Sequence, residues 1–219
     1  MATPMKIDFV SDVSCPWCII GLKALETALE RLDGQVEADI HFQPFELNPN
    51  MGAEGQDLFE HINQKYGLDR AQSAASRETI RARAEEEGFE IRLDRLERIY
   101  NTFDAHRVLH FAAIEGCQRE LKHALFAAYF TDGKNPGDHE VLLQAASDVG
   151  LERERVAALL ASDEFAAEVR DDEQHFQRLG IHAVPAVIIN DRHLVEGGQP
   201  ADVFEQALRQ LAEGTETAA

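Results

Sequence analysis

The spacing of apolar residues near the start of the chain predicts a strand, a helix and a second strand. Residues 6–10 have the apolar, strand-prone composition of a buried strand. Leucines then recur every three or four positions over residues 22–32, which is typical of an amphipathic helix. Over residues 36–42 apolar side chains alternate with polar ones, which indicates a second strand. Because a helix joins them, the two strands should lie parallel in one sheet.

The middle of the chain has helical spacing and no convincing strand. The predicted helices cover residues 58–66, 71–88, 105–115, 121–130, 139–149, 152–160 and 162–179, with Gly or Gly-Pro breakers between most of them. Strand patterns return at residues 183–189 and 193–196, where Asn190-Asp191 forms a tight-turn pair. Residues 201–211 predict a closing amphipathic helix.

This order of elements predicts an α/β protein with the thioredoxin fold. Strand–helix–strand followed by strand–strand–helix would complete one mixed four-stranded sheet, interrupted by a large all-helical insertion. We therefore assign residues 1–52 and 163–219 to a thioredoxin-like core and residues 53–162 to an inserted helical subdomain.

A C-x-x-C motif, Cys15-Pro16-Trp17-Cys18, lies between the first predicted strand and the first helix. A helix N-terminus stabilises a thiolate, and two cysteines one turn apart can close a disulfide. We expect Cys15 to be the nucleophile and Cys18 the resolving thiol that attacks a Cys15–substrate disulfide. Pro16 suits a first helical turn because it has no N–H to leave unpaired, and Trp17 offers an apolar surface beside the sulfur.

The third cysteine, Cys117, stands apart in an apolar helical stretch, where we interpret it as a small buried hydrophobe. A zinc site would need further ligands, and no second C-x-x-C follows. We therefore predict thiol–disulfide chemistry at the cysteine pair and no metal.

Charge and the absence of long apolar segments limit the partners and the compartment. The net charge of -19 disfavours nucleic acid and anionic membranes as partners. The first residues lack the apolar region of a signal peptide, and no window is long enough to span a bilayer. We expect a cytoplasmic protein, monomeric or homodimeric, in which a disulfide would be a cycling one.

Five motifs together resemble the FrnE-like branch of the DsbA-like thioredoxin superfamily. In chain order they are residues 11–18, 45–49, 101–106, 180–185 and 198–200. The relatives of this branch include 2-hydroxychromene-2-carboxylate isomerases and kappa-class glutathione transferases. These relatives share the fold but typically carry Ser at the position of Cys15.

The resemblance implies further site residues. In the resembled family the peptide bond corresponding to Val184–Pro185 is cis and lies against the cysteine pair, so we count Pro185 with the catalytic residues and expect the Val184 backbone to pair with an extended substrate. The resemblance also places Asn48 and the Gly198-Gln199 turn near the position where the relatives hold glutathione.

The sequence leaves the roles of three polar residues undecided. Asn101 belongs to one of the matching motifs and is a candidate for substrate binding. His106 is a candidate to steady a carboxylate or a thiolate, or else a hydrogen-bonded histidine on a helix face. Asp12 is either a base for a buried thiol or a carboxylate in a solvated loop.

The residues and the resemblance favour a dithiol–disulfide oxidoreductase acting on protein or small-thiol substrates. It would need no cofactor, with glutathione as a candidate co-substrate. The alternative is a glutathione-dependent isomerase or transferase, in which Cys15 would orient the glutathione sulfur and Cys18 would be incidental. A third hypothesis is a non-catalytic binding or chaperone-like module.

Overall fold

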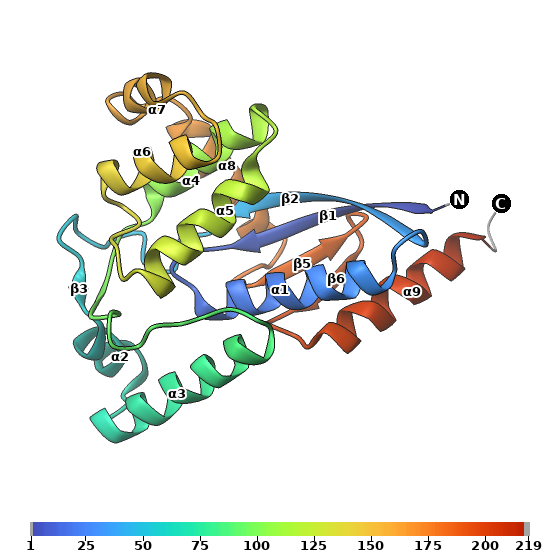
Figure 1. Cartoon of the computed structure of the whole chain (residues 1–219), viewed down its shortest axis with the longest axis horizontal. Coiled ribbons are helices and arrows are strands. Elements are labelled where there is room, and N and C mark those ends of the chain that lie inside the picture. Colours follow the sequence, from blue (N-terminus) through green and yellow to red (C-terminus); the bar gives the residue numbers. More distant parts are fainter. Residues whose placement is uncertain (1, 217–219) are drawn as a thin grey trace.

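Four strands form a mixed central sheet in the order β2-β1-β5-β6 (Figure 1). The structure is a computed structural model that describes residues 2–216. β1 (Thr3–Ser11) pairs in parallel with β2 (Val36–Pro44) and antiparallel with β5 (Ala186–Ile189), which pairs antiparallel with β6 (His193–Glu196). The predicted thioredoxin fold is thereby confirmed, and so is the parallel pairing across the first helix.

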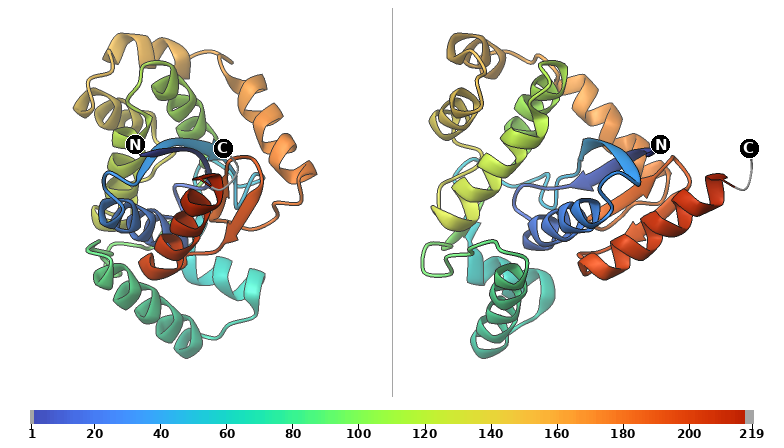
Figure 2. Two further views of the ribbon diagram at one scale, coloured as in Figure 1. Left: turned by 90° about the vertical axis from the view of Figure 1, so that its right-hand side faces the viewer. Right: turned by 45° about the vertical axis from the view of Figure 1, so that its right-hand side comes forward.

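One face of the sheet is covered by α1 (Pro16–Arg31) and α9 (Ala201–Glu216), which lie side by side (Figures 1 and 2). Ile7 and Phe9 of β1 are fully buried in the core shared with these helices. α9 extends past the predicted end at residue 211. Residue 1 and residues 217–219, which we assigned to the core, lie outside the described residues.

The opposite face of the sheet packs against α8 (Ala166–Arg178). Val10 of β1 and Phe176 of α8 belong to a separate apolar cluster on this side. Successive side chains of a strand point to opposite faces, so Phe9 and Val10 pack against different layers of helices. The thioredoxin-like part is thus a three-layer structure.

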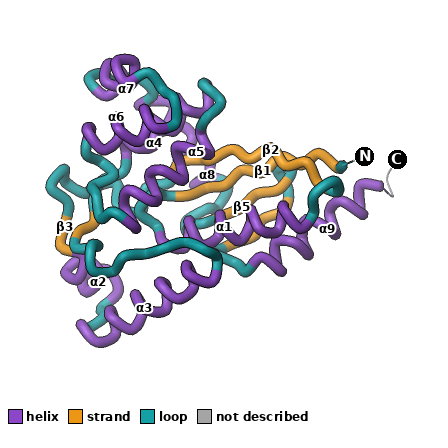
Figure 3. The backbone as a smooth tube through the Cα atoms, viewed as in Figure 1, coloured by secondary structure: helices purple, strands orange, loops and turns teal. Residues whose placement is uncertain are grey.

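The segment between β2 and α8 contains the remaining helices (Figure 3). They are α2 (Leu58–Tyr66), α3 (Arg70–Glu86), α4 (Phe103–Ile114), α5 (Gln118–Phe126), α6 (His139–Asp148) and α7 (Arg153–Leu160), with one π-helical turn at Ala127–Thr131. α4–α7 pack into an apolar core of their own, whereas α3 contacts α1. The exact boundaries of the inserted subdomain, 53–162, stay a prediction.

The insertion is not all-helical, contrary to our expectation. β3 (Gln56–Asp57) and β4 (Arg98–Ile99) form a two-residue antiparallel ladder. Two residues are too short to show an alternating pattern, so hydrophobic periodicity could not reveal them. Within the described residues, each helix is too short or too polar to traverse a lipid bilayer.

Candidate functional site

Cys15 lies at the junction of the β1–α1 loop with α1, where it is the N-cap residue. Its N–H donates to the Asp12 carbonyl at 3.2 Å, and its own carbonyl accepts from the Cys18 N–H at 3.1 Å. Pro16 occupies the first helical position. The Cys15 sulfur therefore sits at a helix N-terminus, where unpaired backbone N–H groups and the helix dipole favour negative charge.

Cys18 lies one turn further along α1 and is completely buried. Burial raises the pKa of Cys18 well above its ordinary value, and the neighbouring Cys15 adds to this effect. Both cysteines are free thiols in the structure. Cys15 is 4% exposed, so both thiols are buried, whereas Trp17 between them is 36% exposed. The two sulfurs therefore differ in position, one at the helix N-terminus and one a turn further along the helix, and not in their exposure to solvent.

The Val184–Pro185 segment lies directly against the motif, although it is far away in the sequence. The Cys15 thiol donates to the Val184 carbonyl oxygen at 3.7 Å, and the peptide bond before Pro185 is cis. A Cβ at Gly21 of α1 would lie 3.2 Å from Pro185 Cγ and 3.3 Å from Gly198 Cα. The absence of a side chain at Gly21 therefore lets the helix approach both loops.

The Gly198-Gln199 turn also reaches the motif, but its two residues differ in orientation. A Cβ at Gly198 would lie 2.9 Å from the Trp17 carbonyl oxygen, so Gly198 is in close contact with the C-x-x-C turn. The Gln199 side chain instead donates back to the Glu196 carbonyl at 2.7 Å. The structure thus places Gly198 beside the cysteine turn and binds the Gln199 amide within its own loop.

Asp12 is completely buried three residues before Cys15, so it does not lie in a solvated loop. Its two carboxylate oxygens accept from the Ser14 N–H at 3.1 Å and the Leu47 N–H at 2.7 Å. The buried His106 places Nε2 3.8 Å from the same carboxylate. Burial alone would raise the pKa of Asp12, but His106 and the two N–H groups outweigh it, and the pKa is lowered. His106 therefore faces a carboxylate.

Asn101 connects the start of α4 to the loop that carries Leu47. Its side-chain oxygen accepts from the Phe103 N–H at 2.9 Å, and its amide donates to Glu46 at 3.4 Å. Glu46 is buried and pairs with Arg170 of α8. Burial raises the pKa of Glu46 against the opposing influence of this arginine. Asn101 and His106 thus support the loops behind the cysteines.

Asn48 lines a pocket of about 620 Å³ formed by the loop after β2 and by α2. Its side-chain oxygen accepts from Lys65 Nζ at 3.2 Å, and its amide nitrogen is buried without a partner among the described residues. Tyr66, which follows Lys65, is 62% exposed, and its pKa is raised by burial and by Cys15. The end of α2 therefore carries both Lys65, which lines the pocket, and Tyr66, whose pKa Cys15 influences.

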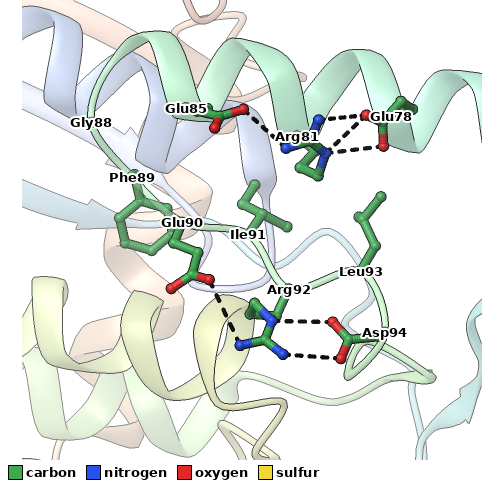
Figure 4. A pocket seen from close by; sticks show the side chains of 10 residues that line it. All are labelled: Glu78, Arg81, Glu85, Gly88, Phe89, Glu90, Ile91, Arg92, Leu93 and Asp94. Atoms are coloured by element: carbon green, nitrogen blue, oxygen red, sulfur yellow. Dashed lines mark hydrogen bonds and ion pairs between the residues drawn. The ribbon is translucent and has the colours of Figure 1, made fainter.

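A second pocket of about 620 Å³ lies between α3 and residues 88–94 (Figure 4). Within it, Arg81 pairs with Glu78 and Glu85, while Arg92 pairs with Glu90 and Asp94. No predicted site residue lines this pocket. The candidate site is therefore the cysteine motif and its surroundings.

Sequence reasoning missed Lys122 of α5, which is completely buried. Burial lowers the pKa of Lys122 to about 8, although Cys18, Asp12 and Cys15 act in the opposite direction. Its position between Leu121 and Leu125, on the apolar side of the helix, was the signal available in the sequence.

The other polar candidates do not form a metal site. His106 and His110 are four residues apart on α4, a spacing found in some metal sites, but His106 is buried against Asp12. Among the side chains of residues 2–214, no group of three or more His, Cys, Asp or Glu could hold a metal ion. Cys117 is half-buried at the start of α5, so it is more exposed than we expected.

Comparisons with known proteins concern the family and the fold of the chain. A DSBA-like thioredoxin domain model matches residues 6–209. The chain is 29% identical over 205 residues to the uncharacterized protein YwbO of Bacillus subtilis, covering 93% of this chain and 96% of YwbO. The crystal structure of a probable DsbA oxidoreductase, SCO1869 from Streptomyces coelicolor, matches with a TM-score of 0.89 and 34% identity over 96% of this chain and 90% of that one.

A more distant structure shows how widely the fold is used. A 2-hydroxychromene-2-carboxylate isomerase matches with a TM-score of 0.74 and 13% identity, over 98% of this chain and 99% of that chain. At this identity the similarity concerns the fold alone. The family match over nearly the whole sequence, together with the cysteine pair at the start of α1, shows that this chain belongs to the DSBA-like thioredoxin domain family.

Proposed function

We propose that the protein is a thiol–disulfide oxidoreductase of the DsbA and FrnE-like type that cycles a disulfide between Cys15 and Cys18. The observation that carries this proposal is the contrast between the two thiols. Both thiols are buried, but Cys15 lies at the helix N-terminus with its sulfur 3.7 Å from the Val184 carbonyl, while Cys18 lies one turn further along the helix and has a raised pKa. A nucleophile at the helix start and a protected resolving thiol one turn away suit a dithiol cycle.

The reaction proceeds in two exchanges. The Cys15 thiolate attacks a substrate disulfide, forms a mixed disulfide and releases the first substrate thiolate. Cys18 loses its proton and attacks the Cys15 sulfur, which closes the enzyme disulfide and releases the second substrate thiolate. The substrate disulfide gains two electrons and the enzyme dithiol loses them; the reverse sequence oxidises a dithiol. In this proposal the backbone of Val184 orients an extended substrate, with Trp17 and Pro185 beside the reacting sulfurs.

Insulin reduction driven by dithiothreitol tests this proposal. The parent protein, Cys15→Ser and Cys18→Ser would be compared, all in a Cys117→Ala background so that the third thiol does not contribute. Turnover should be lost in both active-site variants, and Cys18→Ser should accumulate a mixed disulfide through Cys15. Parent-like turnover in Cys18→Ser would contradict the dithiol mechanism and favour glutathione chemistry, in which no resolving thiol is needed.

The pocket beside Asn48 supports glutathione as a small-thiol co-substrate of the same cycle. Lys65 at the end of α2 lines it, and Cys15 contributes to the raised pKa of the next residue, Tyr66. Incubating Cys18→Ser with oxidised glutathione should give a one-to-one adduct on Cys15, detected by mass spectrometry. Replacing Asn48 with Ala should slow adduct formation, whereas an unchanged rate would place the tripeptide elsewhere.

The motif set also leads us to propose membership of the FrnE-like branch and a cytoplasmic location, where a reducing thiol pool would keep the cysteine pair cycling. Cell fractionation combined with alkylation of free thiols would test the location. Recovery of the protein outside the cytoplasm, with its cysteine pair fully oxidised, would contradict it.

Suppression of client aggregation without any thiol turnover in the parent would instead support a binding module.

A further inference from the structure

Lys122 is a buried amine without a hydrogen-bond partner. Its side chain on α5 is completely buried, and within the described residues its Nζ makes no hydrogen bond. Its Nζ lies over the ring of Phe126, 5.2 Å from the ring centroid. Lysines are almost never fully buried unless paired, because an isolated ammonium loses its hydration. A packed apolar side chain would therefore cost less at this position.

Lys122 lies beside the apolar core that holds the cysteines, because the Phe126 ring under its Nζ belongs to the same buried cluster as Cys15 and Cys18. In agreement with this position, Cys18, Cys15 and Asp12 all raise the pKa of Lys122, which burial lowers to about 8. The influence is mutual, because Lys122 lowers the pKa of Cys18 while burial and Cys15 raise it. The amine and the resolving thiol therefore share one buried environment.

Other charged groups near α5 are already committed. On α5 itself, Arg119 and His123 both pair with Glu26 of α1. On the facing α4, His106 lies against Asp12.

The Asp12 oxygens hold two backbone N–H groups, and its pKa is lowered, so this carboxylate is a poor proton acceptor near neutral pH. Among the described residues, Lys122 Nζ makes no hydrogen bond, and its pKa of about 8 is near the pH range in which a base works best.

We propose that Lys122 is the general base for Cys18 and takes the thiol proton when Cys18 attacks the mixed disulfide on Cys15. This inference rests on the proposed oxidoreductase function. The neutral amine becomes an ammonium as the Cys18 thiolate forms. The bond between Cys15 and the substrate sulfur breaks, and the Cys15–Cys18 bond forms. The substrate sulfur leaves with the electron pair and takes a proton from solvent. The ammonium returns its proton when Cys18 is next released as a thiol.

The role explains why a charged group is kept in the core. A thiol with a strongly raised pKa is a slow nucleophile, because the thiolate is the reacting species. A neighbouring amine that accepts the proton forms the thiolate at the moment of attack without exposing it to water. Proton transfer by a positioned side chain typically contributes about 10²–10⁴-fold to a rate.

Stopped-flow reaction of the reduced protein with Ellman's reagent separates the two thiols. Cys15 attacks first and releases one equivalent of thionitrobenzoate; Cys18 then attacks the mixed disulfide and releases the second. We would compare Lys122→Met with the parent, both in a Cys117→Ala background. The exposed Lys134→Met is the matched control, since it removes one lysine charge from the same inserted segment.

The two releases should respond differently to Lys122→Met. The first should stay within about twofold of the parent, and the second should slow at least about tenfold near neutral pH. The difference should shrink as the pH rises, because hydroxide then removes the Cys18 proton without help. Lys134→Met should match the parent in both phases. Since methionine fills a similar volume without charge, Lys122→Met should fold at least as stably as the parent.

Three results would overturn the inference. One is an unchanged pH profile of the second release in Lys122→Met. Another is equal slowing of both releases at every pH, which would indicate a structural role. The third is normal kinetics in Lys122→Gln, a second variant that covers the case in which the methionine does not pack. If the parent protein released only one equivalent of thionitrobenzoate from the cysteine pair, the proposed function itself would be wrong. This outcome is distinguishable from a failure of the Lys122 inference, because it is seen in the parent without any Lys122 variant.

Discussion

Replacing Glu26 with Gln should weaken the contact that fixes α5 against α1. The Glu26 side chain is 5% exposed and accepts hydrogen bonds from Arg119 at 2.8 Å and His123 at 2.7 Å, both on α5. Lys23 of the same helix donates to its second oxygen at 3.1 Å. Because α1 carries both cysteines and α5 carries Lys122, this contact sets how the amine faces the thiols.

The lowered pKa of Glu26 gives the size of the effect. Burial alone would raise its pKa, but the hydrogen bonds and charges of His123 and Arg119 outweigh burial and lower it from 4.5 to about 2. One pKa unit corresponds to about 1.4 kcal/mol, so the ionised carboxylate stabilises the fold by about 3 kcal/mol. Glutamine keeps an acceptor oxygen but loses the charge, so we expect the free energy of unfolding to fall by about 2 kcal/mol.

The sign of the pH dependence follows from the direction of the shift. A carboxylate with a lowered folded-state pKa stabilises the protein above its unfolded pKa, 4.5, and loses this contribution as the pH falls toward about 2. Urea denaturation followed by Trp17 fluorescence should therefore separate Glu26→Gln from the parent near pH 6. The separation should close progressively below about pH 4.5.

A matched control is available on the same helix. Glu30 is exposed, so Glu30→Gln should leave the free energy of unfolding within about 0.5 kcal/mol of the parent. Equal stability of Glu26→Gln and the parent near pH 6 would refute the reasoning. So would a difference that persists undiminished under acidic conditions, because the loss would then come from packing rather than from charge.

Substitutions at two further positions, Gly198 and Asp12, test how the loops meet the cysteine turn. Gly198→Ala would place a Cβ 2.9 Å from the Trp17 carbonyl oxygen. It should therefore lower the free energy of unfolding in urea by about 1–3 kcal/mol and slow insulin reduction. Gly52→Ala is the control, because a Cβ there would meet open space, and it should change neither quantity. Asp12→Ala should lower the free energy of unfolding by about 3 kcal/mol, because it leaves the backbone N–H groups of Leu47 and Ser14 without their acceptor. Asp12→Asn, which keeps one acceptor oxygen, should lose about half as much; equal losses in the two Asp12 variants would contradict this account.

The sequence predicted the parts of the fold that follow from periodicity and turn chemistry. The first strand, helix and second strand were recognisable because their apolar faces repeat at two distinct periods. The Asn190-Asp191 pair was recognisable as a turn, and both residues have positive φ in the structure. β5 begins at Ala186 rather than at residue 183, since Pro185 has no N–H to contribute to a ladder.

The surroundings of the cysteines could not be predicted in the same way, because burial depends on packing between distant segments. Asp12 had the sequence context of a loop residue, yet Leu47 and His106 enclose it. Lys122 had the context of one polar residue in an amphipathic helix, yet its amine lies over Phe126, which is buried in the same apolar cluster as Cys18. Both positions violate the rule that charges stay outside, and such violations in natural proteins concentrate at functional sites.

The polar groups without partners support the same view of the site. Among the side chains of residues 2–214, the buried atoms lacking a hydrogen bond are Ser14 Oγ, Asn48 Nδ2, His106 Nε2, Lys122 Nζ and Glu173 Oε1. Ser14 precedes Cys15, Asn48 follows Leu47 and His106 lies against Asp12, while Lys122 influences the pKa of Cys18. Native proteins keep few such atoms. In the proposed cycle a negative sulfur forms and disappears at each turnover. Donors that are not committed to a fixed partner can respond to that charge without breaking a bond first, so the same feature that weakens the fold here suits the chemistry.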